Sequence, residues 1–141
     1  MSLLIRVTSV FLLWAYGYHA GSFPARQAVY EMVVKDTLLQ TSSGPVHTFS
    51  VNGAVPPKML QIKPNDKAVV SFRNITTHEL LLSLPEELVT NPLPKDWVTI
   101  LPGQTFRSGL RTAKTGVFDY RITRMEQQDN GVSGVIVIKQ P

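Results

Sequence analysis

The residues of this sequence best suited to chemistry are two histidines that follow its apolar N-terminal segment, His47 and His78. An imidazole side chain serves as a general acid or base, or as a metal ligand. Neither histidine has the neighbouring Ser-Gly elbow that would mark a catalytic nucleophile. Glu86 and Glu87 form a carboxylate pair, but adjacent side chains point apart, which disfavours paired acid–base work. We therefore expect that this domain is not an enzyme.

The chain of 141 residues contains no cysteine. Disulfides, thiolate zinc sites and catalytic cysteines are therefore excluded. The net charge of +4 comes from 14 basic and 10 acidic residues. These charges form no run, basic helix or recognised module, so we expect no binding to nucleic acid. A hydrophobic content of 43% and a charged content of 17% are typical of a folded domain.

The elements that must position these residues are short β-branched and aromatic segments, separated by Gly, Pro and Asn turns. Strands are expected at residues 28–36, 46–51, 59–66, 67–74, 78–84, within 97–106, at 116–123 and at 134–139. The one helical candidate is the short segment 84–91. This spacing predicts an all-β sandwich of seven or eight strands over residues 28–141. In the strand 116–123, Phe118, Tyr120 and Ile122 are predicted to face inward.

The turns of the sequence resemble those of a known family. Their order is Asn52-Gly53, Pro56-Pro57, Asn65-Asp66, Asn74 and then His78, followed by "ILPGQTF", "GVFDYRI" and "GVSGVIVI". This order resembles the plastocyanin-like domains of multicopper oxidases and copper nitrite reductases, which belong to the cupredoxin superfamily. The resemblance covers roughly residues 46–141 and implies a Greek-key β-sandwich of cupredoxin type.

The same resemblance assigns positions to the type 1 copper ligands of that family. The first histidine ligand falls on His78, and the cysteine falls on Ile122. The second histidine falls on Met125, and the methionine falls near Val132. Because a type 1 site requires the copper–thiolate bond, the resemblance implies a scaffold in which Ile122, Met125 and Val132 occupy vacant copper-site positions.

Two interpretations of the remaining candidates stay open. In the first, His78 holds a loop at the end of the sandwich, Met125 fills the apolar space left by the missing cysteine, and no cofactor binds. In the second, His78 and Met125 form a weak copper site, since imidazole and thioether ligands suit Cu(I), and Glu79 and Glu126 add oxygen ligands.

The N-terminal segment resembles a secretory signal. One cation, Arg6, precedes an apolar run at 7–16, small residues follow at Ala20-Gly21-Ser22, and no acidic residue occurs before Glu31. We expect residues 1–25 to be a signal peptide, with a mature N-terminus between Gly21 and Arg26, or an uncleaved signal anchor. The mature domain at 28–141 would then be periplasmic or secreted, and would touch a membrane only through an uncleaved anchor.

The leading hypothesis is therefore a non-enzymatic, extracytoplasmic structural or interaction module without a type 1 copper site. It would bind a protein partner and serve as an accessory subunit of a redox or membrane complex. The alternative is a periplasmic copper carrier or chaperone that uses His78 and Met125.

Overall fold

The computed structural model describes residues 27–91, 93–127 and 131–140. The strands are β1 (Ala28–Thr41), β2 (Gly44–Val51), β3 (Leu60–Ile62), β4 (Ala68–Asn74), β5 (Leu80–Ser83), β6 (Val98–Ile100), β7 (Thr105–Leu110), β8 (Gly116–Arg124) and β9 (Gly131–Ile138). No helix long and apolar enough to cross a membrane occurs in this described part of the chain. The expected signal or anchor segment at residues 1–25 lies outside the described residues.

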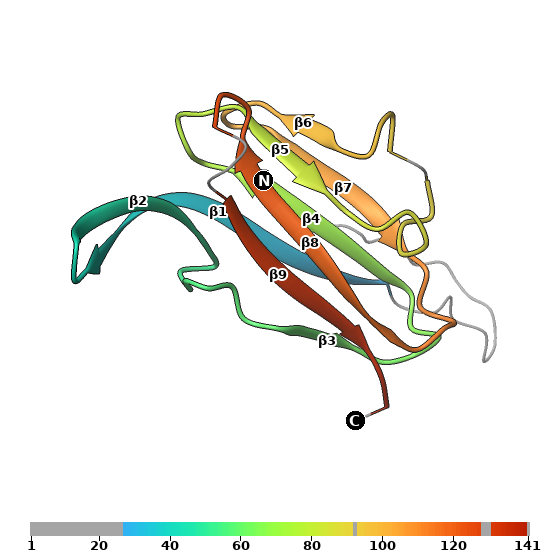
Figure 1. Ribbon diagram of the computed structural model, residues 1–141. Helices are drawn as coiled ribbons and strands as arrows, with labels where there is room; N and C mark the ends of the chain where they lie inside the picture. The colour runs from blue at the N-terminus through green and yellow to red at the C-terminus, as the bar shows by residue number, and fades with distance from the viewer. Residues whose placement is uncertain (1–26, 92, 128–130, 141) are drawn as a thin grey trace, which may run out of the picture.

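The strands form two sheets that pack face to face (Figure 1). The four-stranded sheet has the order β2-β1-β4-β7, and the five-stranded sheet has the order β3-β9-β8-β5-β6. β1 runs parallel to β4, and β3 runs parallel to β9, while the other neighbours are antiparallel. The all-β, Greek-key sandwich predicted from the sequence is confirmed.

The core lies between the sheets and follows the period of two expected of strands that bury one face. In β8, Tyr120 and Ile122 are buried and Phe118 is partly buried, as predicted, while the intervening residues are exposed. Phe72 of β4 meets the edge of the Tyr120 ring with a centroid separation of 5.3 Å. Phe49, at 1% exposure, closes this core from β2.

Two expectations about the elements were wrong. Residues 84–91 form turns rather than a helix, because Leu88 and Val89 are buried and Val89 forms a bridge with Leu110 of β7. One turn of helix has little stability of its own, so burial against β7 decides its backbone. The described strands number nine rather than seven or eight, since Thr105–Leu110 is a strand in its own right after the turn at Gly103.

Candidate functional site

Asn74, the last residue of β4, organises the end of the sandwich that carries His78. Its side chain is completely buried. The Nδ2 group donates to the carbonyls of His78 and Ile100 at 2.8 and 2.9 Å. Its Oδ1 atom accepts from the backbone N–H and the hydroxyl of Thr76 at 2.9 and 2.7 Å. These hydrogen bonds therefore hold the loop before β5 against the end of β6.

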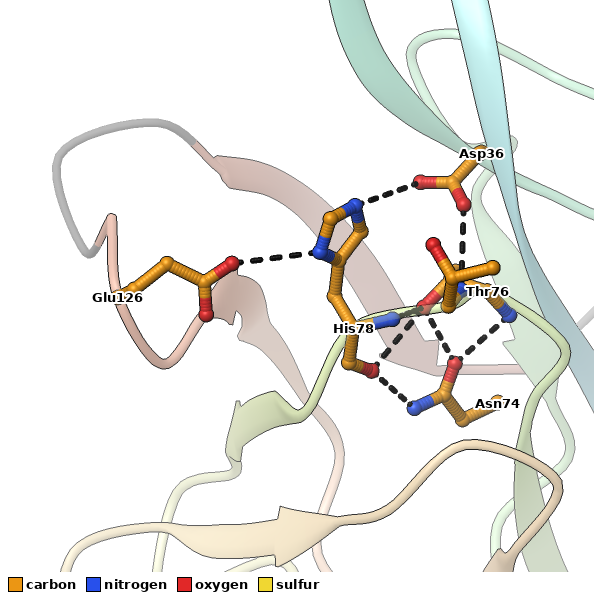
Figure 2. A network of polar contacts seen from close by, with 6 residues as sticks. Asp36, Asn74, Thr76, His78 and Glu126 are labelled. Carbon is orange, nitrogen blue, oxygen red and sulfur yellow. Dashed lines mark hydrogen bonds and ion pairs between the residues drawn. The ribbon is translucent and has the colours of Figure 1, made fainter.

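The imidazole of His78 lies between two carboxylates (Figure 2). Its Nδ1 atom is 3.2 Å from Oε1 of Glu126, and its Nε2 atom is 3.9 Å from Oδ1 of Asp36. Asp36 belongs to β1 of one sheet, and Glu126 follows β8 of the other. A protonated His78 would therefore form ion pairs to both sheets. All three side chains are partly or largely exposed, so each pair contributes little to stability.

Asp36 is a member of this site that sequence reasoning missed. It is far from His78 in the sequence, and no local motif links the two. The parallel pairing of β1 with β4 places Val34 beside Asn74, so Asp36 extends past the end of β4 toward the following loop. Its Oδ2 atom also accepts from the backbone N–H of Thr77 at 3.3 Å. Predicting that Asp36 lies near His78 would have required the register of β1 against β4.

The positions assigned by the copper-protein resemblance have different surroundings. Ile122 is 1% exposed and lies between Leu82 and Val132 on the neighbouring strands. The backbone N–H of Met125 donates to the carbonyl of Glu79 at 3.0 Å, which places Met125 beside the His78 loop. Met125 is nevertheless 46% exposed, so its side chain does not fill an apolar space in the core.

These residues do not fit a type 1 copper centre. The chain has no thiolate to offer, and a buried isoleucine stands at the corresponding position. The two carboxylates near His78 face opposite ring nitrogens, so they do not converge with the imidazole on one ion. Among the described residues, no three His, Cys, Asp or Glu side chains are grouped as metal ligands.

Tyr120 is a further polar residue of the interior. It is 1% exposed, and its hydroxyl has no hydrogen-bond partner among the described residues. Burial raises the pKa of Tyr120 from 10.0 to about 12, because the phenolate would be poorly solvated there. Gly134 pairs with Tyr120 across β8 and β9, and a side chain at Gly134 would collide with the tyrosine ring. The neutral phenol is thus a packing element and offers no base or anionic ligand.

Comparisons with known proteins agree with this architecture. Solved structures similar to this chain include a multicopper oxidase from Pseudomonas thermotolerans, with a TM-score of 0.64 and 20% identity over 84% of this chain and 31% of that one. A copper-containing nitrite reductase from Thermus scotoductus SA-01 gives 0.64 and 20%, over 81% and 28%. A multicopper oxidase from Campylobacter jejuni, described as a metallo-oxidase, gives 0.64 and 15%, over 82% and 26%.

The chain spans less than a third of the length of these three proteins. No protein-family model and no curated protein matches the sequence. At these identities the similarity concerns the fold. The order of the strands, the two-sheet core and these structural neighbours define this chain as a cupredoxin-like β-sandwich.

Proposed function

We propose that this cupredoxin-like domain is a non-enzymatic structural or interaction module outside the cytoplasm and carries no type 1 copper. In this role it would be an accessory subunit of a redox or membrane complex. The names of its structural neighbours, which are copper redox enzymes, support the redox setting. The apolar N-terminal segment supports export.

One observation carries the proposal. Ile122 occupies the position at which the resemblance places the copper cysteine, and it is 1% exposed between Leu82 and Val132. An isoleucine offers no lone pair to a metal, and a buried apolar side chain stabilises the sandwich by packing instead. In this chain the position would serve core packing and not metal binding.

The surroundings of His78 support the same proposal over the copper-carrier alternative. Each ring nitrogen faces a carboxylate of a different sheet, so the histidine already has partners that hold the loop in place. A copper ion at either nitrogen would have to share or displace the contact with Asp36 or Glu126. The exposed Met125 lies beside the loop, which makes it the matched position at which to test the alternative.

Copper titration of the full chain tests the proposal, with Cu(I) and Cu(II) added separately and with a competing chelator present. We expect no stoichiometric binding and no intense absorption band from a copper–thiolate bond. The variants His78→Ala and Met125→Leu should give the same result as the wild-type chain. Tight stoichiometric copper that both variants lose would overturn the proposal and establish the copper carrier.

A further inference from the structure

The edges of the two sheets differ in how they are protected. An unpaired edge strand offers its N–H and C=O groups to any other strand, and proteins normally cover or shorten such edges. β3 and β6 have only three residues each. The C-terminal end of the β7 edge is covered, since the N–H of Thr90 donates to the carbonyl of Gly109 and the N–H of Arg111 donates to the carbonyl of Leu88. β2 is an outer strand with eight residues.

The register of the β1–β2 hairpin identifies which groups of β2 point outward. The N–H of Asn52 donates to the carbonyl of Val33 on β1. The N–H and carbonyl of Val51 instead bond Ala54, on the side away from β1. Because backbone groups alternate along a strand, Pro45, His47 and Phe49 also direct theirs away from β1. Within the described residues, no hydrogen bond involves these outward groups of His47 and Phe49.

The side chains of this hairpin do not discourage association. β2 contains no Asp, Glu, Lys or Arg. The β1–β2 hairpin carries three exposed large apolar residues, which are Leu38 and Leu39 on β1 and Val46 on β2. Figure 1 shows the β1–β2 hairpin reaching away from the rest of the sandwich. A groove of about 490 Å³ runs beside β2, lined in part by Val46, His47, Phe49 and Arg124.

We propose that β2 is a pairing edge for a second copy of this chain, with the two β2 strands antiparallel about a two-fold axis at His47. In this register the N–H of each His47 donates to the carbonyl of the other. The N–H of each Phe49 donates to the carbonyl of the second copy's Pro45. Proline lacks an N–H, and here it lies at the outer ends of the pairing rather than at the centre.

A second copy suits this edge for reasons of charge and symmetry. A two-fold axis brings the same strand to both sides, and that strand has no Asp, Glu, Lys or Arg of its own to place against its copy. Val46 of one copy then faces Thr48 of the other, and the two four-stranded sheets join into one continuous sheet. This inference rests on the proposed interaction role and names one partner for it.

The absence of cysteine permits a direct test in the full chain. In a hydrogen-bonded antiparallel pair the facing Cα atoms lie about 5.5 Å apart, within disulfide range. His47→Cys should therefore give a disulfide-linked dimer rapidly under mild oxidation at low protein concentration. Thr105→Cys places an exposed thiol at the β7 edge and serves as the matched control. Equal cross-linking of both variants would overturn the proposal.

Charge pairs test the register independently. In the double variant Val46→Lys, Thr48→Lys, a lysine of one copy faces a lysine of the other at two places. This repulsion should raise the dissociation constant of the dimer, measured by sedimentation equilibrium, roughly tenfold. In the double variant Val46→Lys, Thr48→Glu, opposite charges face each other at the same two places, so the dissociation constant should stay near that of the wild-type chain. A wild-type chain that stays monomeric throughout the concentration series would overturn the proposal, as would a dimer indifferent to both variants.

Amide hydrogen exchange supplies a second readout. The amides of His47 and Phe49 should become protected as the dimer forms, whereas that of Thr48, which points toward β1, should be protected throughout. The experiments also separate this inference from the proposed function. A monomer that binds no copper leaves the function standing, and a dimer that binds copper tightly leaves the pairing edge standing.

Discussion

Ile122 and His78, two positions that the sequence resemblance assigns to copper ligands, have contrasting surroundings. Ile122 lies on a central strand, where it pairs with the apolar residues Leu82 and Val132 and is 1% exposed. His78 lies on a loop, where two carboxylates face its ring and the Thr76 hydroxyl accepts from its backbone N–H. A strand position that faces the core must be filled by packing once metal chemistry is absent, whereas a loop position keeps a polar residue by finding other partners.

The largest effect on the free energy of unfolding is expected at Ile122. Ile122→Ala should lower the free energy of unfolding by about 2–5 kcal/mol, because it leaves a cavity in the rigid core. Urea unfolding of the purified domain measures it. Val117→Ala changes an exposed residue of the same strand and should cost less than about 0.5 kcal/mol. Similar small losses in both variants would show that the core at Ile122 is loosely packed.

Asn74, a buried residue that holds the His78 loop, should give the next largest effect on the free energy of unfolding. Asn74→Ala removes the side-chain partner of the Ile100 carbonyl and of the Thr76 N–H, and leaves the His78 carbonyl with the Thr76 hydroxyl at 3.1 Å. We expect a loss of about 1–3 kcal/mol in the free energy of unfolding, since buried polar groups without hydrogen bonds are costly. The exposed neighbour Thr77 provides the control Thr77→Ala. If Asn74→Ala lowers the free energy of unfolding no more than Thr77→Ala does, water replaces the hydrogen bonds of the asparagine.

The buried hydroxyl of Tyr120 should make the free energy of unfolding depend on pH. Its pKa is about 12 in the folded chain against 10.0 ordinarily, so the folded state holds the proton more tightly. The associated stability is fully present below pH 10 and is lost as the pH rises to 12, by about 2–3 kcal/mol. Tyr120→Phe should remove this dependence and change stability at neutral pH by less than about 1 kcal/mol.

The measurement is urea unfolding of both proteins at intervals between pH 8 and 12. Other groups titrate in that range in both chains, so the difference between the two curves isolates Tyr120. Parallel curves would indicate that the hydroxyl reaches solvent or a partner in solution.

The smallest effect is expected on the loop side. His78→Ala should change the free energy of unfolding by less than about 1 kcal/mol, because the pairs to Asp36 and Glu126 are partly exposed and screened. Glu126→Gln should give a similar change, and the wild-type advantage should shrink as salt is added. A loss comparable to that of Ile122→Ala would mean that the His78 cluster is a principal support of the fold.

Several local features could be predicted from the sequence because their causes are local. The alternation of Phe118, Tyr120 and Ile122 sets the face of β8, since a slip of one residue would expose all three. The Asn52-Gly53 turn is observed with positive φ angles of 53° and 80° at the two residues. The absence of cysteine excludes a copper thiolate whatever the fold of the chain.

Other features required the tertiary structure because their causes are distant in sequence. The segment 84–91 has the composition of a short helix, yet its contact with β7 holds it as turns. Asp36 reaches His78 only because β1 runs parallel to β4 in one particular register. The free edge of β2 likewise depends on which strand the sheet order places last.

The sequence by itself determined the class of fold, the inward face of β8 and the lack of thiolate chemistry. These properties follow from side-chain type and from a period of two, which act within one strand. The tertiary structure alone decided which carboxylates face His78, how far Met125 is exposed and which edge is open. These depend on pairings between segments many residues apart, where several registers are compatible with the same local pattern and packing selects one.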